Sequence, residues 1–115
     1  MQHILNESVS SAVKELKDSL DNLIHERLKK IILYGSYSHG DYDNESDVDI
    51  LILADLRNDE INKLNKKLDN LSADLSLKYN MVITPILKNI NSFTAYSEAL
   101  PFYNNIIKEG IVLYG

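Results

Sequence analysis

The sequence has no cysteine, and only two prolines and four glycines among its 115 residues. Without cysteine the chain can form neither a disulfide framework nor a thiolate metal site. Any metal must therefore be held by oxygen or histidine ligands, which excludes a zinc finger. No proline- and glycine-rich linker, internal repeat or low-complexity stretch divides the chain. We therefore expect residues 1–115 to form a single domain.

Long apolar runs are also missing. No segment approaches the roughly 20 apolar residues of a membrane-spanning helix, and the N-terminus lacks the charged and apolar regions of a signal peptide. These absences predict a cytoplasmic protein with no membrane partner. The 12 basic residues are outnumbered by 17 acidic ones, giving a net charge of −5. This balance argues against direct nucleic-acid binding by broad phosphate neutralisation.

Two long segments carry apolar residues three or four positions apart, the spacing of an amphipathic helix. They run from Asn6 to about Lys29 and from about Asn58 to Lys78. Short apolar runs predict three buried strands at 30–34, 48–53 and 81–87. In the third run, Pro85 cannot donate a ladder hydrogen bond, which favours an edge strand or a bulge.

The last quarter of the chain predicts two short helices and a final strand. Asn91 or Ser92 could cap the first helix, and Pro101 suits the first turn of the second, which Gly110 would stop. The expected element order is αββαβαα(β), with the optional strand at 111–114. About a dozen residues without helical pattern separate the first two strands, so they should pair as a hairpin. The predicted fold class is α/β (α+β), a small mixed β-sheet backed by helices.

The loop between the first two strands carries the candidate chemistry. Asp47 and Asp49 are two residues apart, so in a strand their carboxylates would lie on one face at the mouth of the sheet. Such a pair needs a cation, and a hard divalent ion such as Mg²⁺ is the natural candidate. Gly35 and Ser36, directly after a strand, let backbone amides and a hydroxyl approach an anion, and Gly40 extends this loop. Taken singly, a Gly-Ser turn and a solvated acidic loop are both common.

Gly35-Ser36, ten intervening residues and Asp47-Val48-Asp49 together resemble the signature of the DNA polymerase β-type nucleotidyltransferase superfamily. The closest resemblance is to the minimal nucleotidyltransferases (MNT), the MntA-like antitoxins of HEPN/MNT toxin–antitoxin pairs. It covers residues 31–53 closely and the whole chain in length and element order. It implies a polymerase β-type nucleotidyltransferase fold, and a single nucleotidyltransferase domain over residues 1–115.

The resemblance also implies an activity: magnesium-dependent transfer of a nucleoside monophosphate, AMP from ATP, to a hydroxyl. For HEPN/MNT pairs the implied acceptor is a tyrosine of the partner HEPN ribonuclease toxin, which adenylylation silences. Matching positions assign Asp47 and Asp49 as the catalytic, magnesium-ligating pair. They assign the nucleotide to a loop formed by Gly35, Ser36, Gly40 and Ser46. His39 lies where many relatives have a basic residue and is a candidate phosphate contact, although a lone loop histidine is more often only solvated.

One feature departs from the superfamily pattern. These enzymes usually supply a third carboxylate from a neighbouring strand, and the expected strand at 81–87 contains no acid. Asp74 belongs to the second long helix and is a poor substitute, so Thr84 is the best polar candidate. Three hypotheses follow: an active transferase antitoxin, a nucleotide-binding antitoxin with weak or no catalysis, and an unrelated acidic structural domain. Four aromatic residues are candidates for a partner surface or for the core: Phe93, Tyr96, Phe102 and Tyr103.

Overall fold

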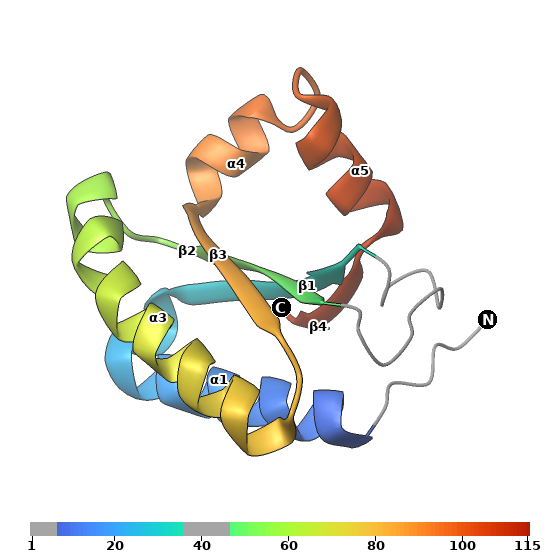
Figure 1. Cartoon of the computed structure of the whole chain (residues 1–115). Helices are drawn as coiled ribbons and strands as arrows, with labels where there is room; N and C mark the ends of the chain where they lie inside the picture. The colour runs from blue at the N-terminus through green and yellow to red at the C-terminus, as the bar shows by residue number, and fades with distance from the viewer. Residues whose placement is uncertain (1–6, 36–46) are drawn as a thin grey trace.

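The computed structural model describes residues 7–35 and 47–115. This described part forms a mixed sheet with helices on both faces (Figure 1). None of its helices is long and apolar enough to cross a membrane. In chain order the elements are α1 (Glu7–Ile24), the 3₁₀ turn η1 (His25–Arg27), β1 (Leu28–Tyr34), β2 (Val48–Ala54), α3 (Asn58–Tyr79), β3 (Ile83–Asn89), α4 (Ile90–Tyr96), α5 (Pro101–Glu109) and β4 (Ile111–Tyr114).

The sheet has the strand order β3-β2-β1-β4. β1 and β2 pair antiparallel, which confirms the predicted hairpin. β3 lies parallel to β2, and β4 lies antiparallel to β1. The predicted element order and the mixed sheet are therefore both confirmed. β3 is an edge strand, where Pro85 is tolerated because an edge residue can face away from the ladder.

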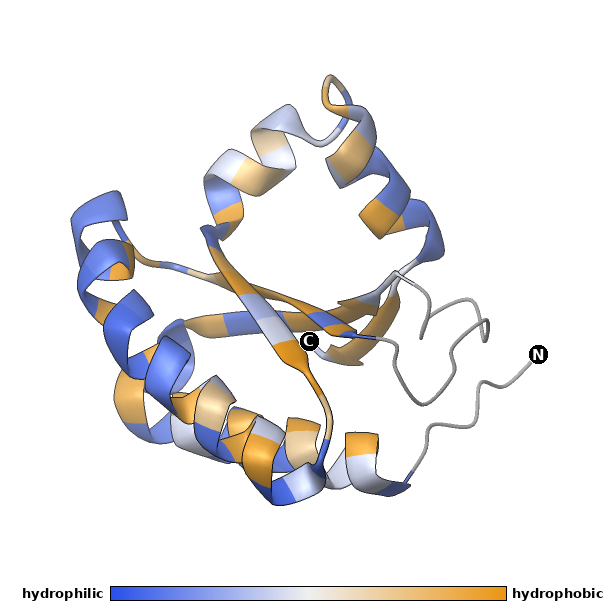
Figure 2. Cartoon of the chain, in the orientation of Figure 1, coloured by the Kyte–Doolittle hydropathy of each residue, from blue (hydrophilic) through white to orange (hydrophobic). Residues whose placement is uncertain are grey.

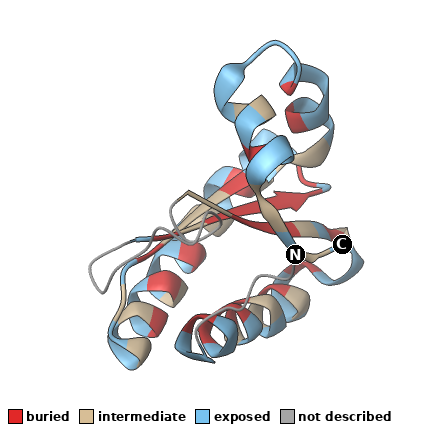
Figure 3. Ribbon diagram, turned by 90° about the vertical axis from the view of Figure 1, so that its right-hand side faces the viewer, coloured by how far each residue is buried: buried red, intermediate tan, exposed pale blue. Residues whose placement is uncertain are grey.

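One face of the sheet packs against α1 and α3, which lie below it in Figure 1. Alternate residues of the two central strands point into this core, as the pleat requires. In Figure 2 the hydrophobic colour is concentrated on these strands, and Figure 3 shows that they are largely buried. The buried residues with the largest fully enclosed side chains in this core include Leu16, Leu20, Ile31, Leu33, Ile50 and Ile52.

The other face packs against the shorter helices α4 and α5. Ile32, Leu51 and Leu53 point to this side and form a second, smaller core with Phe93 of α4 and Ile106 of α5. Because side chains alternate along a strand, Asp49 shares this face with Leu51. The sheet thus turns the candidate metal ligand away from the larger core and toward α4 and α5.

Several element boundaries differ from the sequence prediction. α1 ends at Ile24 rather than near Lys29, because His25 adopts a left-handed conformation with φ of 51° that a helix cannot continue through. Asn80, also at φ of 51°, ends α3, and β3 then runs two residues later than predicted. The cap of α4 was also placed wrongly, since its N-cap is Asn89, whose side chain accepts a hydrogen bond from the Ser92 N–H.

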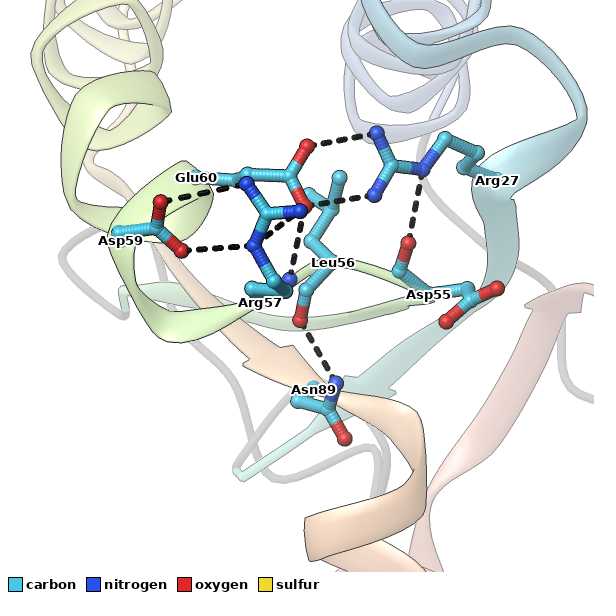
Figure 4. A network of polar contacts seen from close by, with 7 residues as sticks. All are labelled: Arg27, Asp55, Leu56, Arg57, Asp59, Glu60 and Asn89. Carbon is cyan, nitrogen blue, oxygen red and sulfur yellow. Dashed lines mark hydrogen bonds and ion pairs between the residues drawn. The ribbon is translucent and has the colours of Figure 1, made fainter.

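A network of polar contacts connects the elements around the end of β2 (Figure 4). The Arg27 guanidinium donates to both carboxylate oxygens of Glu60 at 2.7 Å, and its Nε donates to the Asp55 carbonyl at 2.8 Å. The Asn89 amide donates to the Leu56 carbonyl at 2.6 Å. These bonds join η1, the start of α3 and the end of β3. The network lies at the end of β2 opposite to Asp49.

Candidate functional site

The candidate site lies where β2 begins. Asp47 directly precedes the strand and is exposed, whereas Asp49 is half-buried as its second residue. Between them, Val48 is only 1% exposed and packs into the core between the sheet and helices α1 and α3. The burial of Val48 fixes the pleat, so the Asp49 side chain must point to the opposite face. The packing of Val48 therefore sets the direction of the Asp49 side chain.

Asp49 is the middle member of a row of three residues that lie directly opposite one another on neighbouring strands. Tyr34 of β1 is its antiparallel partner, and Thr84 of β3 is its parallel partner. The Thr84 hydroxyl donates a hydrogen bond to Asp49 Oδ1 at 2.7 Å, while the Val48 carbonyl is farther from that hydroxyl, at 3.4 Å. One carboxylate oxygen is therefore held by the neighbouring strand.

Gly35 bounds the other carboxylate oxygen of Asp49. Gly35 has φ of +75°, a conformation that residues with a Cβ rarely adopt. A Cβ at this position would lie 2.4 Å from Asp49 Oδ2, which is closer than the two atoms can approach. From the sequence, Gly35 is expected to let an anion approach the backbone closely. The structure adds that its missing side chain leaves room for the Asp49 carboxylate itself.

Thr84 is the polar residue expected to stand nearest to the place of a third carboxylate on its strand. The structure brings its side chain against Asp49. Asp74, expected from the sequence to be a poor substitute, lies in a surface groove between α1 and α3 together with Glu15 and Asp18. The expectation that Asp74 does not complete the site is thus in keeping with its position.

Tyr34 is a member of the site that sequence reasoning missed. Burial, together with the negative charge of Asp49, raises the pKa of Tyr34 to about 12. The phenol therefore stays protonated and neutral at physiological pH beside the carboxylate. Strand alternation could have placed Tyr34 on one face of β1, but only the register of the β1–β2 pair sets it opposite Asp49.

The donor set of the described residues suits a hard cation. Asp47 and Asp49 supply carboxylate oxygens, and Mg²⁺ is usually held by one or two carboxylates together with substrate phosphates. Within residues 7–35 and 47–115, no group of three or more histidine, aspartate or glutamate side chains could hold a metal. An ion held by these carboxylates would therefore complete its coordination with oxygens of water or of a bound ligand.

Four predicted nucleotide-binding residues lie outside the described residues: Ser36, His39, Gly40 and Ser46. Of the seven predicted site residues, the structure therefore describes Gly35, Asp47 and Asp49. It brings Gly35 and Asp49 into contact across the β1–β2 pair.

Comparison with known proteins gives matches over almost the whole chain. Residues 13–114 match the model of the nucleotidyltransferase domain family. Two Methanocaldococcus jannaschii proteins named as protein adenylyltransferases are similar in sequence. One is 41% identical over 103 residues, covering 90% of this chain and 95% of the relative. The other is 35% identical over 91 residues, covering 79% and 90%.

Three solved structures share the fold. A mutant MntA–HpeT toxin–antitoxin structure aligns with a TM-score of 0.59 at 24% identity, covering 97% of this chain and 74% of that chain. A toxin–antitoxin structure with AMP-PNP aligns at 0.55 and 22%, covering 90% and 73%. The structure of a tri-AMPylated Shewanella oneidensis HEPN toxin in complex with MNT antitoxin aligns at 0.51 and 22%, covering 94% and 72%. The polymerase β-type nucleotidyltransferase fold predicted from the sequence is thereby confirmed.

Proposed function

This chain belongs to the nucleotidyltransferase domain family, as its motif predicted, and from that membership we propose that it is a magnesium-dependent protein adenylyltransferase. The proposed reaction moves AMP from ATP to a tyrosine hydroxyl of a HEPN-domain toxin and so makes the chain an antitoxin. Two relatives in sequence are named as protein adenylyltransferases, and the structures of similar fold contain toxin–antitoxin pairs, one with a tri-AMPylated toxin. We further propose that residues 1–115 act as a single nucleotidyltransferase domain.

The single observation that supports this proposal best is the setting of Asp49. Its carboxylate is held on one side by the Thr84 hydroxyl and has space on the other only because residue 35 is glycine. An acidic residue that served only solubility would need neither arrangement. A carboxylate fixed in this way, next to the exposed Asp47, is pre-organised for a ligand.

We assign Asp47 and Asp49 to the bound magnesium and Gly35, Ser36, Gly40 and Ser46 to the nucleotide, with His39 as a further phosphate contact. Because the described residues offer no complete metal cage, phosphate oxygens of ATP would supply the remaining ligands. Metal and nucleotide binding should then be coupled, each strengthening the other.

In the proposed reaction the acceptor tyrosine oxygen attacks the α-phosphorus of ATP. The bond from that phosphorus to the oxygen bridging to the β-phosphorus breaks, and pyrophosphate leaves. The proton of the tyrosine passes to water, since the residue opposite Asp49 on β3 is Thr84 rather than a carboxylate. Magnesium, when bound, would neutralise charge that develops on the phosphate oxygens and lower the pKa of the attacking hydroxyl.

A second candidate function is a nucleotide-binding antitoxin with weak or no transferase activity, which neutralises its partner by binding alone. The observation that favours it is the hydroxyl at position 84. A threonine can orient Asp49 but cannot take up a proton or contribute a charged metal ligand there. Both candidates bind ATP with magnesium, and they differ in whether AMP reaches the partner.

The experiment that tests the proposal mixes the full chain, magnesium, ATP labelled on the α-phosphate and a HEPN-domain protein, for which the reading frames beside the gene of this chain are the place to search. We expect label on a tyrosine of the partner, located by mass spectrometry, and none when magnesium is chelated. Transfer by the wild type with magnesium chelated would contradict the metal assignment. A complex that inhibits the partner without label would support the second candidate instead.

Substitutions then test the site. Asp47→Asn and Asp49→Asn should each abolish labelling while leaving the fold intact, with an unchanged or higher melting temperature without magnesium because like-charge repulsion is relieved. Asp74→Asn makes the same chemical change at an exposed carboxylate between α1 and α3 and should label normally. Equal activity of Asp49→Asn and Asp74→Asn would refute the site assignment.

A further inference from the structure

An exposed aromatic residue stands beside the candidate site on the α4 and α5 side of the sheet. Phe102 is the second residue of α5, and its side chain is 52% exposed. Its ring meets that of Tyr34 edge-to-face, with 5.8 Å between centroids and 89° between planes. An exposed phenylalanine forfeits much of the stabilisation that burial would provide. Its position therefore calls for an explanation.

The backbone holds Phe102 in place from both sides. Pro101 begins α5 with a fixed φ, directly before Phe102. The next residue, Tyr103, packs against Phe93 of α4 with 4.6 Å between ring centroids, so it belongs to the smaller core. The first turn of α5, which packs against the smaller core through Tyr103, therefore positions the Phe102 ring.

Phe102 is connected to Asp49 through one residue. Tyr34 touches the Phe102 ring and is the direct cross-strand partner of Asp49. Tyr34 packs against the smaller core on the face covered by α4 and α5, Asp49 shares that face by strand alternation, and Phe102 belongs to α5 itself. In a nucleotide the ribose separates the base from the phosphates. A base whose phosphates lie at Asp47 and Asp49 must therefore rest about one side chain away from them, where Phe102 stands.

We propose that Phe102, supported edge-on by Tyr34, is the platform on which the base of the bound nucleotide stacks. This inference rests on the proposed function, because it takes the phosphates to lie at Asp47 and Asp49. An aromatic face favours any base, since every base has a π-face. In the proposed reaction the nucleotide is ATP, so the stacked base is adenine. The platform adds affinity for this base rather than for the phosphates.

The test compares a ligand that has a base with one that lacks it. Binding of ATP and of inorganic tripolyphosphate, both with magnesium, is measured by titration calorimetry on the full chain. Alanine substitution at a stacking aromatic typically weakens binding by about tenfold or more per base. We expect Phe102→Ala to weaken ATP binding by about this factor and to leave tripolyphosphate binding unchanged. Phe102→Tyr keeps an aromatic ring and should bind ATP like the wild type.

Two control variants separate stacking from general loss of an exposed side chain. Tyr96→Ala removes a ring that is 58% exposed on α4 and lines a groove with the first residues of α3, at the far end of the sheet. Val82→Ala changes an apolar residue that is 53% exposed and directly precedes β3. β3 lies on the opposite side of β2 from Tyr34 and β1. Both variants should bind ATP like the wild type. A loss at Val82→Ala instead of Phe102→Ala would overturn the proposal by placing the base on the other side.

Other outcomes are equally decisive. If the wild type binds ATP and Phe102→Ala binds it equally well, the platform is refuted and the proposed function stands. If Phe102→Ala weakens ATP and tripolyphosphate alike, the residue acts on the phosphate site and the platform is again refuted. If the wild type binds neither ligand, the proposed function fails and this inference fails with it. Should Phe102→Ala not fold, Phe102→Leu keeps apolar bulk without an aromatic face and should show the same selective loss.

Discussion

The Thr84 hydroxyl donates a hydrogen bond to the Asp49 carboxylate at 2.7 Å. The two residues are 35 positions apart in the sequence and lie on neighbouring strands. This bond joins the edge strand β3 to the central strand β2 at the candidate metal site. It gives a half-buried carboxylate a fixed orientation without adding a charge beside it. The described site therefore joins the Asp49 carboxylate to one neutral hydroxyl, with Asp47 two residues before it in the chain.

Thr84→Val should weaken magnesium-dependent ATP binding, because valine keeps the shape of threonine but removes the donor to Asp49. A hydrogen bond to a charged group contributes roughly 1.5–3 kcal/mol, so we expect a loss of about an order of magnitude in affinity. Thr84→Ser retains the hydroxyl and serves as the control in the same titration. A loss in Thr84→Ser together with wild-type binding by Thr84→Val would show that the methyl group, and not the hydroxyl, is what matters.

Thr84→Asp should increase the stabilisation that magnesium provides. The Thr84 side chain faces Asp49, so an aspartate there would complete a set of three carboxylates for a hard cation. Without magnesium the same variant should melt at a lower temperature than the wild type because of like-charge repulsion. Thermal melting with and without magnesium measures both effects. A folded variant with no gain from magnesium would mean that Thr84 is not at the third ligand position.

Gly35→Ala should damage both stability and ligand binding. The new Cβ would meet Asp49 Oδ2 at 2.4 Å, and alanine at φ of +75° is strained. A strained backbone conformation of this kind costs about 1–3 kcal/mol, which urea denaturation can measure. In addition, displacement of the Asp49 carboxylate should weaken ATP binding by the folded protein.

Gly110→Ala is the matched control for Gly35→Ala. Its Cβ would lie 2.5 Å from the Ile106 carbonyl oxygen, so it too should destabilise the fold, but it touches no candidate ligand. We expect Gly110→Ala to bind ATP normally once folded. Normal ATP binding by Gly35→Ala would show that the close approach of Gly35 and Asp49 has no role in the site.

The acid stability of the protein should depend on Glu60. The Arg27 guanidinium, with the Arg57 backbone N–H, lowers the pKa of Glu60 from 4.5 to about 2. A depressed folded-state pKa stabilises the fold fully above the unfolded value of 4.5, and this contribution is lost as the pH falls toward 2. Urea denaturation of Glu60→Gln should therefore show a weaker dependence of unfolding free energy on pH between about 4.5 and 2 than the wild type. Glu98→Gln, at an exposed carboxylate without an ion pair in the described part of the chain, should behave like the wild type. A wild-type pH dependence in Glu60→Gln would assign the effect to other carboxylates.

The sequence alone determined most of the elements and the chemistry of the central motif. Helix and strand periodicities are local, so α1, α3 and the strands could be recognised from the spacing of their apolar residues. The lack of helical pattern between β1 and β2 was enough to predict their antiparallel pairing. Asp47 and Asp49 were selected by their spacing and by the glycine that follows the preceding strand. Family membership followed from the same residues.

Only the tertiary structure decided which residues surround those carboxylates. The register of β2 with β3 sets Thr84 against Asp49, and that of β1 with β2 sets Tyr34 there. The position of Phe102 over Tyr34 depends on how α5 packs across the sheet. Register and helix placement arise from the packing of both faces at once, between segments far apart in the chain, and local patterns carry no record of them. Periodicity also missed the end of α1, which left-handed His25 sets at Ile24, whereas it located the end of α3 to within one residue.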